Sequence, residues 1–398
     1  MNILYIHQYF KTPEQPGGTR SYWFARELVN RGHNVTMITS KSSQSENVIN
    51  KKVDGINVFY LKNPYKFSMG VFRRMISFVR FAFKSSRFAL KQKKIDLVIA
   101  TSTPLTVGIP ALLCKWMKGV NYVFEVRDLW PEVPIQMGGM TNPIMCRIAK
   151  GLEKKIYKNA KHIIALSPGM KKGVTETGIP KEKVSMIPNM SKVDKFWRRE
   201  KNVDAANNYG ISLNKFNVIH FGAMGLANGL EYMIDAAEIS QKNSENDICY
   251  ILLGDGSQKD KLLNEAEKRK LRNVKFIPRQ PMDVVSEIVN LCDASFVPFK
   301  NLPVLWTNSP NKLFDSLSAG IPIIVNSPGW TKDMVKKNKC GAYVNPEKPQ
   351  ELVDLLCNWK NNPQLVKKMG DASRNLAETV YDKSILCRKF IEVINSKI

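Results

Sequence analysis

The sequence has few of the side chains that build disulfide frameworks or metal sites. Its seven cysteines are scattered and form no Cys-x-x-Cys pair, which is typical of free thiols in a reducing compartment. Only four histidines occur, no two of them at metal-ligand spacing, and no Asp-x-Asp motif is present. We therefore expect a protein that uses no metal and no other cofactor.

Long apolar runs are also missing. No stretch reaches the roughly 18 uninterrupted apolar residues that span a membrane. The segment Met1–Ile6 is too short for a signal peptide and lacks its basic start. These absences predict a soluble, cytoplasmic protein.

Acidic residues are scarce, and their scarcity is uneven. The chain has 60 Lys and Arg against 35 Asp and Glu, a net charge of +25. Residues 1–200 contain 34 basic and 13 acidic residues, whereas residues 201–398 contain 26 and 22. Any anionic partner, either a membrane surface or a nucleic acid, should therefore meet the first half.

Short Val- and Ile-rich runs alternate with longer amphipathic stretches, which predicts an α/β protein with parallel strands buried on both faces. A first series of runs ends near Pro188, a polar linker follows, and a second series starts near Asn217. We expect two Rossmann-like doubly wound domains that face each other across a cleft. The predicted bounds are residues 1–195 and 210–375, with a C-terminal helix in residues 376–398 that crosses back to the first domain. The expected strands of the first domain are Ile3–His7, Val35–Thr39, Ile56–Leu61, Leu97–Ala100, Tyr122–Val126 and His162–Leu166. Those of the second are Asn217–Phe221, Cys249–Leu253, Val274–Ile277, Ala294–Val297, Pro322–Asn326 and Gly341–Val344.

Loops at the carboxyl ends of parallel strands are the usual ligand sites of such sheets. The loop Gln15–Thr19 contains the pair Gly17 and Gly18, which would let the backbone approach a phosphate. An ordinary turn between a strand and a helix remains an alternative. A dinucleotide-binding domain is disfavoured because Gly-x-Gly-x-x-Gly is absent.

The segment 308–324 gives a sharper signal. Ser309 is predicted to cap a helix and Pro310 to occupy its first position. Lys312 would then lie in the first turn, where the helix dipole favours anions, so a bound diphosphate is indicated. Asp315, three residues on, would share its face and could accept hydrogen bonds from the two hydroxyls of a ribose. A surface Lys–Asp pair remains equally open.

Three stretches together resemble one enzyme family. They are His7–Phe10 with Gly17–Arg20 and Gly32–Thr36, Glu125–Glu132, and Ser309–Asp315 with Ala319–Pro322. The sequence is similar to the retaining, nucleotide-sugar-dependent glycosyltransferases of family GT4, which have the GT-B fold. More narrowly, it resembles the WbuB/WcaI-type transferases of surface polysaccharides. The resemblance covers essentially the whole chain.

The resemblance implies that the second domain binds a UDP-sugar and that the first binds the acceptor. It assigns Lys312 to the diphosphate as a catalytic cation and Asp315 to the ribose. The implied donor contacts are Gly17, Gly18, Ile277, Arg279, Thr307, Asn308, Ser309, Asn311, Lys312 and Asp315. We expect acceptor contacts from His7, Arg20 and Asp128, with Asp128 also catalytic, and a structural role at the strand end is the alternative for His7.

Two positions depart from the family pattern. The usual pair of acids is represented by Thr307 and Asp315, so the backbone or Asn308 would have to replace the missing carboxylate. The basic pair that normally follows the first strand of the second domain is also absent, since Phe221–Gly229 contains no Lys or Arg. Phosphate charge would then fall to Lys312, with Arg279 or Arg20, and to helix N-termini.

Departure of a diphosphate requires cationic and N–H stabilisation, because the leaving group gains negative charge. Retention implies a same-face mechanism in which a leaving phosphate oxygen helps to deprotonate the acceptor. Asp128 could orient the acceptor or act as a base. A helix cap or an ion pair with Arg127 is the alternative.

The segment Lys62–Lys94 contains ten Lys and Arg and no acid. On a helix, one apolar face would pack on the domain, and a second aromatic face flanked by cations would meet anionic lipid. The predicted membrane contacts are Arg73, Arg80, Phe81, Lys84, Arg87 and Phe88. A solvated basic helix whose phenylalanines are covered by a neighbour is the alternative.

We therefore predict a retaining transferase that moves an N-acetylated hexosamine from a UDP-sugar to a polyprenyl-diphosphate-linked acceptor, in capsule or O-antigen synthesis. It would lie on the cytoplasmic face of the cell membrane and bind no nucleic acid. A non-hydrolysing nucleotide-sugar 2-epimerase and a basic nucleic-acid-binding protein are the alternatives, although no nucleic-acid-reading motif is present.

Overall fold

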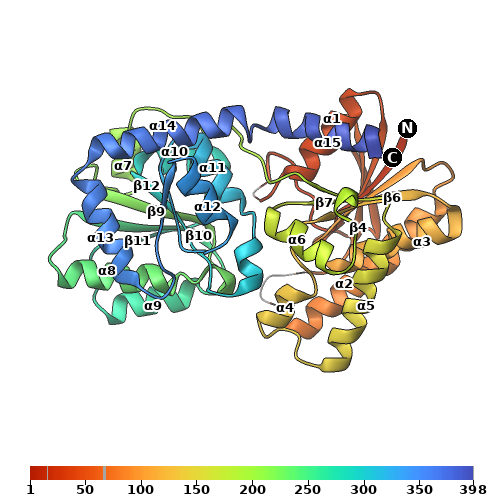
Figure 1. Cartoon of the computed structure of the whole chain (residues 1–398), viewed down its shortest axis with the longest axis horizontal. Coiled ribbons are helices and arrows are strands. Elements are labelled where there is room, and N and C mark those ends of the chain that lie inside the picture. Colours follow the sequence, from red (N-terminus) through yellow and green to blue (C-terminus); the bar gives the residue numbers. More distant parts are fainter. Residues whose placement is uncertain (16, 66–68, 398) are drawn as a thin grey trace. The chain divides into compact units, whose positions relative to one another are not determined.

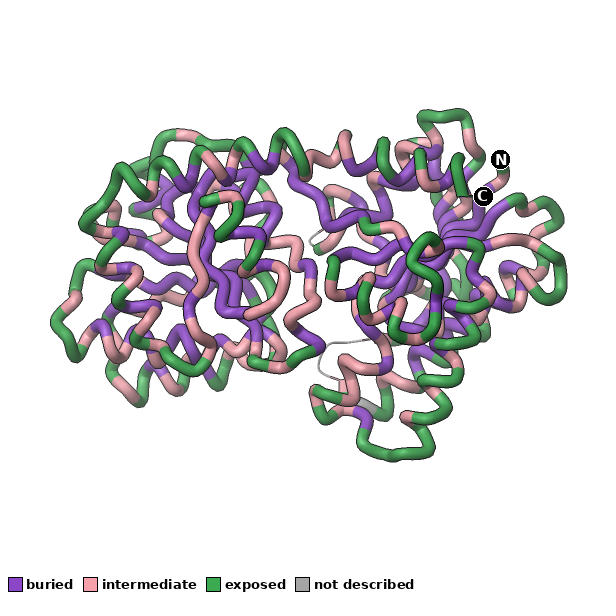
Figure 2. Tube along the Cα trace, viewed as in Figure 1, coloured by how far each residue is buried: buried purple, intermediate pink, exposed green. Residues whose placement is uncertain are grey.

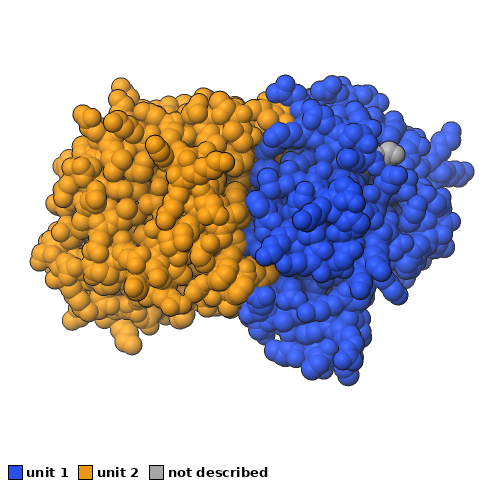
Figure 3. All heavy atoms as spheres, in the orientation of Figure 1, with its two compact units in different colours: residues 1–188, 307–309, 386–398 blue, residues 189–306, 310–385 orange. Residues whose placement is uncertain are grey.

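The computed structural model describes residues 1–15, 17–65 and 69–397. Pro16 of the first glycine loop and residues 66–68 of the basic segment lie outside the described residues. The chain forms two compact units (Figure 3), which are described separately. Unit 1 consists of Met1–Pro188, Thr307–Ser309 and Leu386–Ile398, and unit 2 of Asn189–Trp306 and Pro310–Ile385.

Unit 1 is built on a sheet in the order β3-β4-β2-β1-β5-β6-β7-β8, in which only β3 runs antiparallel to its neighbour. Its strands are β1 (Asn2–Ile6), β2 (Asn34–Lys41), β3 (Val48–Val53), β4 (Ile56–Lys62), β5 (Leu97–Thr101), β6 (Asn121–Val126), β7 (His162–Ala165) and β8 (Val184–Met186). The six strands predicted from the sequence are confirmed within one or two residues, and β3 and β8 were missed. The central strands are buried on both faces, as their continuous apolar runs require (Figure 2).

Helices flank this sheet (Figure 1). They are α1 (Arg20–Asn30), α2 (Val71–Lys91), α3 (Gly108–Lys118), α4 (Glu132–Gln136), α5 (Pro143–Asn159) and α6 (Pro168–Glu176), with short 3-10 turns η1 (Leu105–Val107) and η2 (Lys181–Lys183). The last helix, α15 (Lys383–Lys397), contributes residues from Leu386 onward to unit 1. There the ring of Phe390 stacks on that of Phe24 in α1, with centroids 4.1 Å apart.

Unit 2 has a fully parallel sheet in the order β11-β10-β9-β12-β13-β14. Its strands are β9 (Phe216–Ala223), β10 (Ile248–Asp255), β11 (Val274–Ile277), β12 (Ala294–Val297), β13 (Ile323–Val325) and β14 (Gly341–Tyr343). All six had been predicted. Both units are therefore doubly wound α/β sheets, which confirms the predicted fold class.

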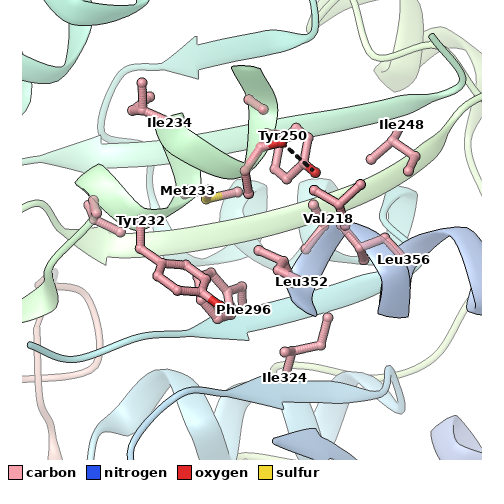
Figure 4. Packing of buried hydrophobic residues seen from close by; sticks show 14 of the residues in the cluster. Val218, Tyr232, Met233, Ile234, Ile248, Tyr250, Phe296, Ile324, Leu352 and Leu356 are labelled. Atoms are coloured by element: carbon pink, nitrogen blue, oxygen red, sulfur yellow. Dashed lines mark hydrogen bonds between the residues drawn. The ribbon is translucent and has the colours of Figure 1, made fainter. Parts of the chain in front are cut away.

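The helices of unit 2 cover both faces of its sheet (Figure 1). They are α7 (Val203–Asn208), α8 (Glu231–Lys242), α9 (Lys259–Lys268), α10 (Met282–Leu291), α11 (Asn311–Ala319), α12 (Trp330–Lys337), α13 (Pro349–Lys360) and α14 (Pro363–Thr379), with 3-10 turns η3 (Leu226–Asn228) and η4 (Pro303–Thr307). On one face, Val218, Tyr232, Phe296 and Leu352 belong to one buried cluster (Figure 4), in which the rings of Tyr232 and Phe296 lie 5.6 Å apart. This packing supports β9, at whose carboxyl end the site of unit 2 lies.

Candidate functional site

Helix α11 presents its N-terminus beside the end of β9. The helix starts at Asn311 with Pro310 as its N-cap, a residue whose side chain makes no capping hydrogen bond. The prediction that Ser309 caps the helix and that Pro310 is its first residue is therefore wrong by one position. The first-turn N–H groups of a helix lack intrahelical acceptors and can meet an anionic ligand.

Lys312 is the cation of this site. Its Nζ lies 3.0 Å from Nε2 of His220 on β9 and 3.5 Å from Oδ1 of Asn228 on η3. Burial lowers the pKa of Lys312 to about 7. Gly222, at φ +111°, lies so close that a Cβ there would be 3.7 Å from the Lys312 side chain. The backbone and the amine therefore meet at the end of β9.

No carboxylate among the described residues forms an ion pair with Lys312. A lysine amine held in a partly buried site without an acidic partner is unfavourable unless an anion joins it. The expectation that Lys312 and Asp315 form a surface pair is wrong, because Asp315 has another partner.

Asp315 is 7% exposed and pairs with Lys192, whose Nζ lies 3.0 Å from Oδ1. Burial raises the pKa of Asp315, and the Lys192 ammonium opposes that rise. Lys192 itself lies above the ring of Phe196, 5.5 Å from its centroid. Sequence analysis missed Lys192, because it lies more than a hundred residues before Asp315 and in no motif.

His220 was missed as well. It is fully buried, its Nε2 lies 3.3 Å from the carbonyl oxygen of Ala223, and burial followed by the Lys312 charge holds its pKa well below the usual value. The one signal in the sequence was its position two residues before Gly222, the glycine that follows the predicted strand Asn217–Phe221.

The remaining donor residues predicted from the sequence lie in both units. In unit 2, Ile277 ends β11 with its side chain in the core, which leaves only its backbone to a ligand, and Arg279 is exposed just beyond it. Asn311 opens α11. Thr307, Asn308 and Ser309 belong to unit 1, as do Gly17 and Gly18. Their donor contacts stay predictions.

In unit 1, the carboxyl ends of β1, β5 and β6 bring a second group together. Asp128, just after β6, accepts a hydrogen bond from the Thr103 hydroxyl at 2.6 Å. Burial raises the pKa of Asp128, opposed by Thr103 and by Arg127. His7 Nε2 lies 3.2 Å from Arg127, and burial, then Arg127, keep the pKa of His7 well below its usual value. A neutral imidazole and a carboxyl whose pKa is raised by burial thus share one sheet edge.

Arg20 does not belong to that group. It is 1% exposed, its Nε donates to Glu125 at 2.7 Å, and its terminal nitrogens donate to the carbonyls of Ile187 and Pro188. The guanidinium also lies 4.4 Å from the centroid of the Phe24 ring. The prediction that Arg20 contacts the acceptor or a phosphate is therefore wrong, because its donors tie α1 to β6 and to the segment after β8.

Helix α2 turns a different face outward than the sequence predicted. Phe81 is fully buried, and partly buried Phe88 packs on Phe59 at 4.6 Å, so neither is available to a membrane. The outward apolar face consists of Phe72, Ile76, Val79 and Phe83. Arg73, Arg80 and Arg87 are exposed, whereas Lys84 donates to the carbonyl of Lys62.

Close packing explains this orientation. Ala82, Ser85 and Ala89 are buried, α2 packs against α3, and Lys118 of α3 donates to the carbonyl of Ala89. The larger Phe72, at 78% exposure, and Phe83, at 67%, remain outside.

The described residues show neither a metal site nor a membrane span. No three His, Cys, Asp or Glu side chains among them gather as metal ligands would. Within the same residues, no helix combines the length and hydropathy needed to cross a bilayer.

Two different family models match the chain, one in each half. Residues 17–190 match the glycosyl transferase 4-like domain, and residues 204–376 match the glycosyl transferases group 1 family. Over 313 residues the chain is 25% identical to WcaI of Escherichia coli K12, named as a colanic acid biosynthesis glycosyl transferase, covering 77% of this chain and 75% of that protein.

Two further proteins are similar to this chain. The α-galactosylglucosyldiacylglycerol synthase of Streptococcus pneumoniae is 23% identical over 252 residues, 60% of this chain and 63% of that enzyme. The structure of Anabaena HepE in complex with UDP-glucose superimposes with a TM-score of 0.72 over all of both chains, at 17% identity.

Proposed function

The chain belongs to the GT4-type glycosyltransferases with the GT-B fold, and on this basis we propose that it transfers an N-acetylated hexosamine, with retention, from a UDP-sugar to a polyprenyl-diphosphate-linked saccharide. Its glycosyltransferase activity serves surface polysaccharide or glycolipid synthesis. Capsule or O-antigen is the proposed product. The observation on which the proposal rests is the Lys312 amine, which lacks a carboxylate partner among the described residues and lies at the N-terminus of α11.

Lys312 would meet the charge that gathers on the departing diphosphate. The first-turn N–H groups of α11 would add a second, fixed positive potential. Asp315 would accept from the ribose hydroxyls, with the neighbouring Lys192 ammonium favouring its ionised form. The backbone at Ile277, together with Arg279, would meet the base. Because protein groups supply the cation, we propose transfer without a metal and without another cofactor.

On the acceptor side, Asp128 is the proposed catalytic carboxylate. Its raised pKa and its hydrogen bond from Thr103 suit a group that receives or shares the proton of the acceptor hydroxyl. His7, kept neutral, would orient the same hydroxyl. In the retaining mechanism that we propose, a leaving phosphate oxygen takes part in that proton transfer.

A transfer assay tests this function. Radiolabelled UDP-N-acetylhexosamines and UDP-glucose would be offered with a synthetic polyprenyl-diphosphate-linked N-acetylhexosamine, and label in the lipid phase counted. Lys312→Gln should lower kcat/KM by about 10²–10³, the usual cost of losing one group that stabilises developing charge. Asp128→Asn should lower kcat by about 10²–10⁴. Lys268→Gln, a matched exposed lysine on α9, should have no effect.

Three outcomes would contradict the proposal. Transfer from no UDP-sugar would reject the reaction, and full activity in Asp315→Ala would reject the assigned site. Conversion of the donor alone to its 2-epimer would establish the epimerase instead.

We also propose that unit 1 docks on the anionic cytoplasmic face of the cell membrane. The outward apolar face of α2 lies beside Arg73, Arg80 and Arg87 in a segment without acids. Helix α5 also contacts α3 and exposes Ile144 and Ile148. Apolar insertion together with cations is the chemistry of a peripheral membrane surface, where each cation contributes about 1 kcal/mol.

Flotation with vesicles of phosphatidylcholine, with and without phosphatidylglycerol, tests the membrane surface. Phe72→Ser with Phe83→Ser, and separately Arg80→Glu with Arg87→Glu, should each lower binding to the anionic vesicles by about tenfold or more. Val203→Ser removes another exposed apolar residue, on α7 of unit 2, and serves as the control. Equal binding of all variants would reject the surface, and a salt-sensitive shift of DNA or RNA would favour the nucleic-acid alternative.

A further inference from the structure

Three side chains from three different elements converge at the end of β9. His220 comes from the strand, Asn228 from η3 and Lys312 from the first turn of α11. The amide of Asn228 donates to the carbonyl of Ala223 at 2.8 Å, which leaves its Oδ1 turned to the Lys312 amine. The cluster therefore holds one amine between an imidazole nitrogen and an amide oxygen.

Lys312 supplies the positive charge that β9 and the loop after it lack. The segment Phe221–Gly229 contains no Lys or Arg, so β9 brings no cation of its own to the site. Lys312 reaches the same strand end from α11, with its side chain next to Gly222. A long side chain with four rotatable bonds needs an acceptor to hold it there.

The surrounding ionisable groups are engaged elsewhere. Asp315, one turn along α11, pairs with Lys192, and Glu231, which opens α8 after η3, pairs with Lys261 at 3.1 Å. The other contacts of the amine, Asn228 and the backbone at Gly222, do not titrate. His220 is the one titratable group of the described residues recorded in contact with it.

The neutral imidazole of His220 can form a hydrogen bond with Lys312 whether the amine is neutral or protonated. With its proton on Nε2, it donates to the Ala223 carbonyl or to a neutral amine. With the proton on Nδ1, the Nε2 lone pair accepts from an ammonium. Because His220 remains neutral, it stabilises the ammonium without adding a second charge.

We propose that His220 is the positioning residue for Lys312: it accepts a hydrogen bond from the ammonium and holds that cation at the end of β9 for the diphosphate of the donor. The amine takes its proton from solvent as the anion binds and releases it when the nucleotide leaves. Binding of the donor is thereby coupled to uptake of about one proton. This inference rests on the proposed UDP-sugar function and adds a residue and a proton that the function does not require.

The test uses UDP and uridine as probes for the whole chain. Calorimetry in two buffers of different ionisation enthalpy gives both the Kd of UDP and the protons taken up between pH 7 and 9. Over this range the β-phosphate is already ionised. For the unaltered chain we expect proton uptake approaching one near pH 8, because burial places the pKa of the free amine near 7 and the anion raises it.

His220→Leu removes the acceptor and should weaken UDP binding by about tenfold, the range of one charge-assisted hydrogen bond. It should also move the decline of affinity with pH to lower pH and leave uridine binding unchanged. His220→Gln, whose Oε1 can accept from the amine, should restore affinity. His220→Asn, too short to reach, should behave as His220→Leu does, and serves if the leucine variant fails to fold. Lys312→Gln should abolish proton uptake.

His162→Gln is the matched control, because it replaces another buried strand histidine, in β7 of unit 1. Equal UDP affinity and proton uptake in His220→Leu, or no proton uptake by the unaltered chain, would overturn the inference. If the unaltered chain bound UDP no better than uridine, the proposed donor would fail instead, so the two failures are distinguishable.

Discussion

Replacing Lys312 with methionine should stabilise the ligand-free protein. The pKa of this amine falls from 10.5 to about 7 because of burial, with no counter-charge recorded among the described residues. Between those two values the unfolded chain binds a proton that the folded chain does not. The lysine therefore costs stability at neutral pH, and the cost declines as pH rises.

The size of this effect follows from the same shift. Full linkage would give a cost of about 4 kcal/mol at pH 7 and about 2 kcal/mol at pH 9. Because Lys312 is partly accessible to solvent, we expect roughly half of these values. Lys312→Met should thus gain about 2 kcal/mol at pH 7 and about 1 kcal/mol at pH 9, less whatever its contacts with His220 and Asn228 contribute.

Urea unfolding of the parent, Lys312→Met and Lys268→Met at pH 7, 8 and 9 would measure the difference. UDP should stabilise the parent and not Lys312→Met. The reasoning would be refuted if the gain were the same at pH 7 and 9, or if Lys312→Met were less stable than the parent at pH 7. Lys268→Met, which alters an exposed lysine, should follow the parent at every pH.

Other variants test the rest of the structure. Arg20→Met should destabilise unit 1 by about 3–5 kcal/mol in urea unfolding, because it leaves Glu125 buried without its partner; a loss below about 1 kcal/mol would argue against the buried pair. Lys192→Met removes the charge that lowers the pKa of Asp315, so the acidic limb of the pH–activity profile should move to higher pH. If that limb does not move, Lys192 does not influence the site. Asp128 has a raised pKa and should be active when ionised, so kcat should fall as pH falls through that pKa, and Asp128→Asn should abolish this limb.

Much of the fold could be predicted because parallel strands buried on both faces are continuous Val- and Ile-rich runs. The two strands that escaped prediction lack this signature. Strand β3 is an antiparallel edge strand whose Lys51 and Lys52 face solvent, and β8 has only three residues. Edge position and short length remove the hydrophobic pattern on which the prediction depended.

The candidate site was predicted only where it is local in sequence. Lys312 and Asp315 lie three residues apart on one helix, so their proximity follows from helical geometry. Their partners lie far away, His220 on β9 and Lys192 before α7, and only the folding of unit 2 brings them to the amine and the carboxylate. For Arg20 the motif misled the prediction. Its buried guanidinium donates to Glu125 and to the carbonyl of Ile187, so it connects elements of unit 1.

Helix α2 shows most clearly what the sequence determines and what only the tertiary structure decides. The sequence alone predicted a basic, acid-free helix within Lys62–Lys94 with apolar residues on more than one face, since helical periodicity and charge are local properties. Only tertiary packing decided which face is buried. Where α2 packs on the domain, Phe81 is buried together with the small Ala82, Ser85 and Ala89, and Phe72 and Phe83 face outward. Periodicity cannot rank two apolar faces, because the choice depends on the shape of the partner against which the helix packs.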